Sequence, residues 1–398
     1  MLELSIMNHG GAFVEEMRAM LQEFEQEAHI DVNLRVLEWR DAWAELVKVA
    51  LYGDGPHVSE IGNTWLSEFV SMNALRPFVG MEVTRLGGAK QFLPSAWQSV
   101  TPAGTSNRAV MIWAVPWLAD MRLIHYRQDI FERAGLEAKT AFQTPEALLQ
   151  TCARLQAAGV ANPIVVPSRQ SRMTMHNLAA WVWGSGGDFT SPDGKKVLFA
   201  LSQAKAGIYA YFDLARYLPP EMRERDEYQS DEAYWSGQAA MTISGPWLHL
   251  SPDMPRELAP RTRQVLPPGV PYIGGSHLVI WKHTRDVEQA LALIRYLNRV
   301  EAQARFVRTS GLFPSRLEVL THEPFNSDPF YQMAGEGLKV GRAFPTFSLW
   351  GLVENKLTEA FTAIWADILE RPLADIHAIV DERLNDTAQR LSSTLAYY

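Results

Sequence analysis

Five tryptophans stand beside residues that commonly end helices and strands. Of the thirteen tryptophans in the chain, four directly adjoin a glycine or a proline, and a fifth follows the tripeptide GNT. They are Trp117, Trp183, Trp247, Trp350 and, after GNT, Trp65. An indole has a flat apolar face on which the C–H face of a sugar can stack, while neighbouring polar groups bond the sugar hydroxyls. A sugar site is one interpretation of these rings, and packing in a partly buried core is the other.

Polar residues and glycines lie close to these rings. They are Asn8 and His9 before a Gly-Gly pair, Asn63 and Thr64 before Trp65, Asp120 after Trp117, and Asp188 after WGSGG. Gly275 and Ser276 precede an expected strand, where backbone N–H groups can come close to a ligand. Asn, Asp and Gly are also the commonest turn residues, so each of these positions can equally be structural.

Known catalytic signatures are missing from the sequence. It contains no G-x-S-x-G, H-E-x-x-H, P-loop or G-x-G-x-x-G motif, and its one cysteine, Cys152, rules out an intrachain disulfide and a cysteine-rich zinc site. A pair of carboxylates for glycoside hydrolysis stays open, because their separation is a property of the fold. We therefore expect binding rather than catalysis, with no cofactor and no metal, and keep a carbohydrate-cleaving enzyme as the alternative.

The hydrophobic pattern predicts an α/β fold. Apolar residues alternate over 2–6, follow helical spacing over 13–28 and alternate again over 30–36, which is a βαβ unit with a parallel sheet. A helix at 41–51, a strand at 57–61 and a helix at 64–72 follow.

A second α/β series begins at Met121. A strand over 121–126 leads into a helix that stops at Gly135, and Thr144 with Pro145 is a helix N-cap signal. Further expected elements are a strand at 162–167, a hairpin at 191–199, strands at 239–244 and 278–281, and helices at 286–297, 301–309 and over most of 352–395.

Composition limits the partners. Lys and Arg number 37 against 45 Asp and Glu, a net charge of −8, and no long basic cluster indicates a nucleic-acid surface. There is no run of 18 apolar residues for a transmembrane helix. The chain starts with the strand-like LELSIM and no export signal; taken literally this predicts a cytoplasmic protein, and removal of a signal would leave the same sequence.

Six ordered motifs connect the chain to a known family. They are EIGNTWLSEF, VPWLADMRLIHYRQDIFERAGL, WVWGSGGDF, GQAAMTISGPW, GGSHLVIWK with EAQARFVRTSGLFPSR, and GRAFPTFSLWG. In this order they resemble the extracellular solute-binding proteins of carbohydrate ABC importers, the maltose and multi-sugar group.

The resemblance implies a two-lobed periplasmic-binding-protein-like α/β fold of type II, with a ligand cleft between lobes joined by a hinge of several crossings. The N-terminal lobe would comprise 1–118 and 274–313, and the C-terminal lobe 119–273 and 314–398. The protein would be a monomer that captures a sugar by hinge closure and delivers it to the permease subunits of an ABC transporter. Its place would be periplasmic, or extracellular and membrane-associated.

The resemblance also implies a set of ligand-binding residues, in which the Trp117 ring stacks on the sugar and the Asp120 carboxylate accepts from its hydroxyls. The full set is Asn8, His9, Trp39, Asn63, Thr64, Trp65, Trp117, Asp120, Trp183, Asp188, Trp247, Gly275, Ser276, Arg316, Phe344 and Trp350. A polyamine site would be richer in acids, and an amino-acid site would need an arginine for the carboxylate. Many rings, two acids and one arginine favour a neutral polyol over these alternatives.

Overall fold

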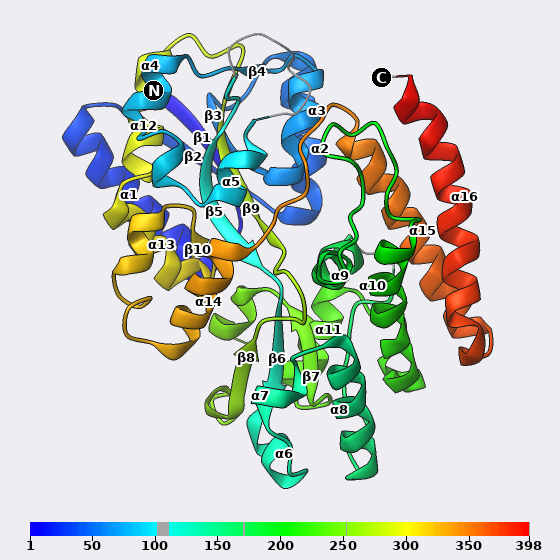
Figure 1. Cartoon of the computed structure of the whole chain (residues 1–398). Helices are drawn as coiled ribbons and strands as arrows, with labels where there is room; N and C mark the ends of the chain where they lie inside the picture. The colour runs from blue at the N-terminus through cyan, green and yellow to red at the C-terminus, as the bar shows by residue number, and fades with distance from the viewer. Residues whose placement is uncertain (102–110, 170–171, 252, 398) are drawn as a thin grey trace. The chain divides into compact units, whose positions relative to one another are not determined.

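The chain begins with the parallel βαβ unit that its sequence predicts. Strand β1 (Leu2–Met7) pairs with β2 (Val32–Leu37) in parallel, and α1 (Gly11–Ala28) connects them. Helix α2 (Trp39–Tyr52) then leads to β3 (Val58–Gly62), which pairs in parallel with the other edge of β1. Because such crossovers are right-handed, α1 and α2 lie on opposite faces of the sheet (Figure 1).

The structure is a computed structural model that describes residues 1–101, 111–169, 172–251 and 253–397. The chain divides into two compact units. Unit 1 comprises Met1–Asp120, Ile273–Lys339 and Ala343–Gly351, and unit 2 comprises Met121–Tyr272, Val340–Arg342 and Leu352–Tyr398. The chain therefore passes from one unit to the other at five points.

The sheet of unit 1 is completed by segments from far along the chain. Its strand order is β10-β5-β9-β3-β1-β2, and β4 also pairs with β9. The added strands are β4 (Leu75–Arg76), β5 (Val115–Met121), β9 (Ile273–Trp281) and β10 (Phe313–Pro314). Strand β9 runs antiparallel to β3. Gly275 has φ +130°, and a Cβ there would lie 2.1 Å from the Leu118 carbonyl oxygen, so this glycine is what lets β9 approach β5.

Helices cover both faces of this sheet. Helices α12 and α13 pack against α1, which turns Phe13, Met17, Met20, Leu21 and Phe24 into the core as the helical spacing predicts. The helices of unit 1 after α2 are α3 (Leu66–Ser71), α4 (Gly80–Arg85), α5 (Pro94–Ser99), α12 (Val287–Leu297), α13 (Val300–Ser310) and α14 (Pro329–Val340), whose last residue belongs to unit 2.

Unit 2 has a small antiparallel sheet in the order β7-β6-β8. Its strands are β6 (Leu123–Arg127), β7 (Met241–Ser244) and β8 (Thr262–Val265). The main helices are α6 (Gln128–Arg133), α7 (Ala138–Ala141), α8 (Pro145–Ala157), α9 (Met173–Gly184), α10 (Ser202–Phe212), α11 (Glu227–Trp235), α15 (Trp350–Glu370), whose first two residues belong to unit 1, and α16 (Ile376–Ala396). Thr144 caps α8 as predicted, because its Oγ1 accepts from the Ala147 N–H at 3.1 Å, and Cys152 is buried.

Three sequence predictions need correction. The segment 162–167 forms one bridge, Val165 with Thr242, instead of a strand. The hairpin at 191–199 is a turn closed by one bridge, Thr190 with Val197, without flanking strands. The strand expected over 121–126 is broken at Arg122, between the end of β5 and the start of β6. The segments 162–167 and 191–199 have the local signals of strands but find only single bridges in the fold, whereas β6, after the break, is paired on both sides.

The predicted lobes differ from the units in one segment. The predicted boundaries after 118 and 273 lie two residues and one residue from those of the units, whereas 314–339 and 343–351 belong to unit 1 instead of the second lobe. The reason is visible in the sheet, where β10 pairs with β5 and holds the following segment against unit 1.

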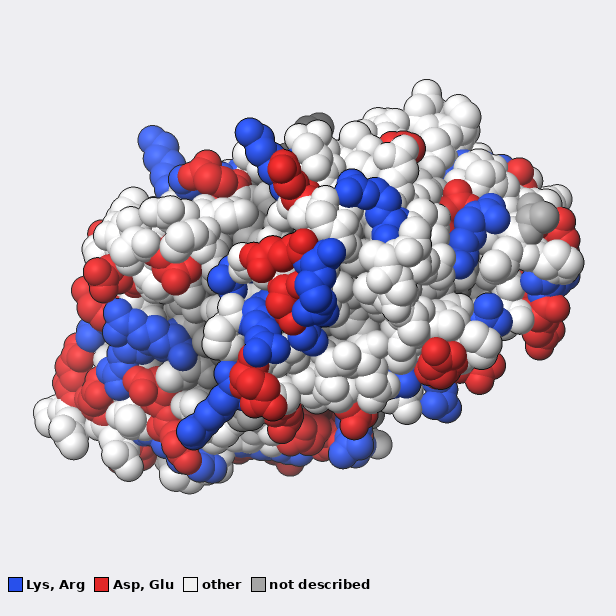
Figure 2. Space-filling model, turned by 90° about the horizontal axis from the view of Figure 1, so that it is seen from below, with Lys and Arg blue, Asp and Glu red and all other residues white. Residues whose placement is uncertain are grey.

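Two properties of the described residues bear on partners. Among them, no helix combines the length and the apolar character needed to cross a bilayer. On the face shown in Figure 2, Lys and Arg side chains are interspersed with Asp and Glu side chains. This mixture differs from the continuous basic surface of a nucleic-acid-binding protein.

The buried His125 makes stability depend on pH. Its Nε2 lies 3.0 Å from the Gly245 carbonyl oxygen, and burial lowers the pKa of His125 from 6.5 to about 3. In the unfolded chain His125 is therefore protonated below about pH 6.5, whereas in the folded chain it stays neutral down to about pH 3. We expect the free energy of unfolding to fall below pH 6.5, by up to about 1.4 kcal/mol per pH unit from this group. Urea titrations between pH 7.5 and 5 measure the slope.

The wild type is compared with two variants. His125→Gln should show a smaller change of the free energy of unfolding with pH. His322→Gln changes an exposed imidazole and should show the same change as the wild type. Equal slopes for all three proteins would contradict the assignment.

Candidate functional site

In unit 1, three aromatic residues meet where the parallel strands end. His9 follows β1, Trp39 follows β2 and Trp65 follows β3, so all three lie at the carboxyl edge of the sheet. The His9 and Trp39 ring centroids are 5.5 Å apart, and those of Trp39 and Trp65 are 6.0 Å apart, both edge to face. This edge is where open α/β sheets bind ligands. We call His9, Trp39 and Trp65 the strand-end cluster.

Glu60 fixes the position of His9. This carboxylate is fully buried in β3, accepts from the Met7 N–H at 2.7 Å and lies 2.8 Å from His9 Nε2. A buried carboxylate is stable only with such partners. Asn8 is held as well, because it donates to Glu38 at 2.8 Å and accepts from the Gly10 N–H at 3.0 Å. The loop after β1 is therefore fixed by carboxylates from β3 and from the residue after β2.

The remaining polar candidates of unit 1 lie next to the same edge. Ser276 pairs with Gly62 in the β9–β3 ladder, directly before Asn63 and Thr64. Asn63 and Ser276 are buried and Thr64 is partly exposed. Asp120, also partly exposed, is the last residue of the first segment of unit 1. Their proximity in the sequence to the strand ends keeps them as candidates.

In unit 2, a buried arginine lies against two aromatic rings. The Arg122 guanidinium carbon is 4.9 Å from the Trp247 ring centroid and 6.0 Å from that of Tyr272, and Arg122 is only 3% exposed. Tyr272 stacks on His176 with centroids 4.7 Å apart. Cation–π contacts gain strength in such a desolvated setting. We call Arg122, Trp247, Tyr272 and His176 the arginine–aromatic cluster.

Trp247 is held in place from two sides. Its indole N–H donates to Asp231 Oδ2 at 3.1 Å, and a Cβ on Gly245 would lie 2.0 Å from the ring, so only glycine fits beneath it. Burial raises the pKa of the Asp231 carboxyl to about 6, although its hydrogen bonds with Ser244 and Trp247 act in the opposite direction. The Trp247 side chain is only partly buried and keeps an accessible surface.

Trp183 and Asp188 come together, but mainly with each other. The Trp183 indole N–H donates to Asp188 Oδ1 at 3.1 Å, and Arg342 pairs with Asp188 Oδ2 at 2.6 Å. The Arg342 guanidinium also lies 4.8 Å from the Trp183 ring centroid. Both carboxylate oxygens of Asp188 therefore accept from residues of unit 2, and the Arg342 guanidinium lies over the Trp183 ring. This pair supports the site rather than forming its surface.

The structure corrects the roles of Trp117 and Trp350. Trp117 is fully buried in unit 1, with its ring centroid 5.3 Å from Phe306 and 6.1 Å from Phe13, so its face is not available for stacking on a sugar. Trp350 is 1% exposed and stacks on Phe344, itself buried, with centroids 5.0 Å apart. All three rings are core residues, because other aromatic rings pack against them, from distant segments at Trp117 and from the preceding loop at Trp350.

Arg316 and Gly275 have other structural tasks. Arg316 donates to the Asn298 carbonyl oxygen at 3.0 Å and lies over Phe92, within a separate pocket of unit 1. Gly275 provides the close approach to Leu118 described above. Neither residue contacts the strand-end cluster in any described interaction.

Sequence reasoning missed several residues that the structure places in the two clusters or in hydrogen bonds with them. They are Glu60, Arg122, His176, Asp231 and Tyr272. A signal was present for Arg122, the one charged residue in the apolar run from Met121 to Ile124, because a charge in a buried strand requires a specific partner. Chemically, the two clusters offer rings, hydrogen-bond donors and acceptors. In the part of the chain that the structure describes, no group of His, Cys, Asp and Glu side chains is suited to hold a metal ion.

Comparison with known proteins agrees with the fold. A sequence model of the family described as bacterial extracellular solute-binding protein matches residues 10–304. A putative binding protein of Brucella abortus is 22% identical over 321 residues, which cover 77% of this chain and 74% of the relative.

Solved structures of similar fold cover almost the whole chain. An ABC transporter solute-binding protein of Thermotoga lettingae, solved with α-D-tagatose, has a TM-score of 0.83 at 21% identity and covers 99% of each chain. Maltose-bound MalE3 of T. maritima has a TM-score of 0.77 at 20% identity and covers 100% of each chain. The two-lobed periplasmic-binding-protein-like fold of type II follows from these matches.

Replacement of the buried Trp117 should damage the fold. We expect Trp117→Ala to lower the free energy of unfolding of unit 1 by about 3–5 kcal/mol, because the cavity between Phe13 and Phe306 would not refill. Trp39→Ala removes a partly exposed ring and should cost clearly less. Urea unfolding followed by circular dichroism measures both, and an unchanged unfolding midpoint for Trp117→Ala would show that the ring is not a core residue.

Proposed function

Because this chain belongs to the family of bacterial extracellular solute-binding proteins, we propose that it binds a neutral mono- or oligosaccharide and delivers it unaltered to the permease subunits of an ABC importer. The observation that carries the proposal is the presence, in each unit separately, of a partly exposed tryptophan that contacts other rings and lies near polar side chains. In unit 1 this ring is Trp39, and in unit 2 it is Trp247.

The chemistry of the two clusters supports a polyol. Sugars present C–H faces for stacking and hydroxyls that both donate and accept, and they need no net charge from the protein. The strand-end cluster combines rings with His9 and Asn8, whose positions are set by carboxylates. Around Trp247, the Arg122 guanidinium and the Asp231 carboxyl lie in one neighbourhood, so donors and acceptors occur together.

Similar structures support the same ligand class. The relative from Thermotoga lettingae was solved with a monosaccharide, and the protein from T. maritima with maltose. A neutral sugar is therefore the ligand that both the clusters and the fold favour. We further propose that the protein acts as a monomer outside the cytoplasmic membrane, does not bind nucleic acid and does not cleave its ligand.

Removal of either exposed ring should weaken sugar binding. We expect Trp39→Ala and Trp247→Ala each to cost about 2–4 kcal/mol of binding free energy, as is typical of a stacked anchor. The wild type is first screened against a sugar panel by thermal shift, since a ligand at about 100 times its Kd stabilises by about 2.7 kcal/mol. Calorimetry then gives the Kd of each variant.

The matched control is Trp97→Ala, which removes a partly exposed ring stacked on Phe92 in unit 1 and should leave the Kd unchanged. Chromatography of the sugar after incubation tests for products. Cleavage of the sugar would establish the carbohydrate-cleaving alternative, and binding of polyamines or amino acids without any sugar would overturn the ligand class.

The hinge closure implied by the family resemblance stays a prediction. The chain passes between the units at five points, one of them directly after Asp120. We expect saturating sugar to lower the radius of gyration in small-angle scattering, because a ligand favours the form that it binds more tightly. Asp120→Asn should weaken binding by about 1.5–3 kcal/mol if the carboxylate accepts from sugar hydroxyls. An unchanged radius of gyration would refute hinge closure, and an unchanged Kd of Asp120→Asn would refute a contact between this carboxylate and the sugar.

A further inference from the structure

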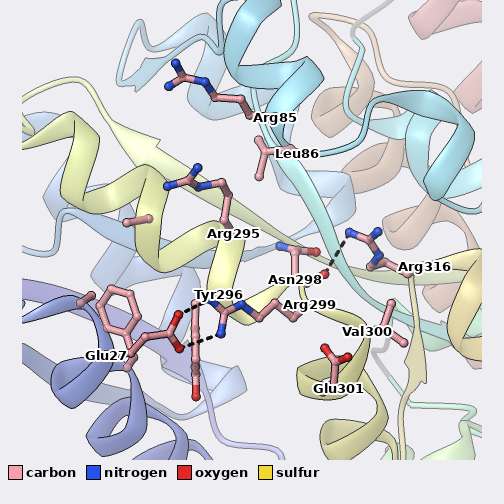
Figure 3. Close-up of a pocket in the computed structure, with 13 residues that line it drawn as sticks. Glu27, Arg85, Leu86, Arg295, Tyr296, Asn298, Arg299, Val300, Glu301 and Arg316 are labelled. Carbon is pink, nitrogen blue, oxygen red and sulfur yellow. Dashed lines mark hydrogen bonds and ion pairs between the residues drawn. The ribbon is translucent and has the colours of Figure 1, made fainter.

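Unit 1 contains a second hollow, separate from the strand-end cluster. A pocket of about 520 Å³ is lined by residues of α1, α4, α12 and α13 and by Arg316 (Figure 3). Its α1 residues, among them Phe24 and Glu27, belong to the last turns of the helix, shortly before β2 begins. This end of α1 lies where the parallel strands start, whereas the strand-end cluster lies where they finish. The pocket and the cluster are therefore at opposite edges of one sheet.

The pocket carries positive charge in an acidic protein. Four arginines line it, Arg85, Arg295, Arg299 and Arg316, against two glutamates, while the whole chain has a net charge of −8. Arg299 is already neutralised by Glu27, its Nη1 donating to Oε2 at 2.8 Å. Figure 3 shows the Arg85 and Arg295 side chains, from α4 and α12, extending to the same side, whereas Arg316, from the segment after β10, lies apart from them beside Asn298.

Two of these guanidinium groups have unused donors. Arg295 is exposed and forms no hydrogen bond or ion pair with the residues that the structure describes. Arg316 is half-buried; its Nη1 donates to the Asn298 carbonyl oxygen, but its buried Nε has no acceptor in the described part of the chain. Burial also lowers the pKa of the Arg316 guanidinium, because the charged form loses part of its hydration in the partly buried site. An anion in the pocket would offset this loss.

Most of the rest of the lining is apolar. Leu86, Ala292, Tyr296, Val300 and Phe24 line the pocket, and Asn298 and Glu301 are the polar exceptions besides Glu27. A bare inorganic ion would leave this wall without contacts. The volume lies within the range of small-molecule sites. The geometry thus suits a ligand with one charged end and one apolar end.

We propose that this pocket binds a small organic anion, whose phosphate or carboxylate group is held by Arg85 and Arg295 and whose apolar body packs against Leu86 and Tyr296, while Arg316 adds positive charge to the same pocket. The planar guanidinium fork matches both oxyanions in a bidentate manner, which a lysine would not provide. The site is distinct from the proposed sugar site, so that occupation of one leaves the other accessible.

Phenyl phosphate, phenylacetate and inorganic phosphate are the probes, compared at equal low ionic strength by thermal shift and calorimetry. We expect phenyl phosphate or phenylacetate to bind the wild type, and the better of the two identifies the oxyanion. Inorganic phosphate should bind more weakly than phenyl phosphate. Arg85→Gln and Arg295→Gln should each weaken binding about tenfold or more, as expected for loss of a charge-assisted hydrogen bond.

Arg18→Gln is the matched control, because Arg18 is an exposed arginine of α1 outside the pocket lining. It should bind the probes like the wild type, and all three variants should keep the sugar affinity. The proposal is overturned if neither organic anion binds, if Arg18→Gln weakens binding as much as the pocket variants, or if inorganic phosphate binds as tightly as phenyl phosphate. Since sugar binding is measured separately, failure here and failure of the proposed sugar function are distinguishable.

Discussion

Unit 1 depends on the contact of strand β9 with the first strands of the chain. The Trp281 indole N–H donates to Ser59 Oγ at 2.7 Å, and Ser59 shares a 2.6 Å hydrogen bond with Ser5. All three side chains are buried, and they join β9, β3 and β1. Breaking one bond would leave a polar group without a partner in the core, which is costly. The N-terminal βαβ unit therefore needs a segment more than 200 residues away to complete its sheet.

This dependence explains which predictions from the sequence were right. The βαβ unit at the N-terminus, the cap at Thr144 and the amphipathic helices α12 and α13 are set by residues close together in sequence, and periodicity reveals them. The segments 162–167 and 191–199 have the same local signals. They fail to form strands because the fold supplies only single bridges, a fact that no local pattern contains.

The candidate site shows the same division between local and distant causes. Rings at the ends of strands could be predicted, and His9, Trp39 and Trp65 meet as the topology requires. Whether a ring is accessible could not be predicted. Trp117 is enclosed by Phe306, which is distant in the sequence, and Trp350 is covered by Phe344, which folds back from the preceding loop. The partners that orient the accessible rings, such as Asp231 for Trp247, were also invisible in the sequence.

Two arginine environments separate the two proposed sites by their chemistry. Arg122 is buried, with Trp247 and Tyr272 near its guanidinium, and the neighbouring Asp231 carboxyl interacts with its charge. Such a group acts as a rigid, charge-compensated support beside a stacking ring, which suits an uncharged ligand. Arg295 and Arg85 are exposed at the rim of a pocket with excess positive charge. Their charge is available to a ligand, and that difference is why a neutral sugar is assigned to the clusters and an anion to the pocket.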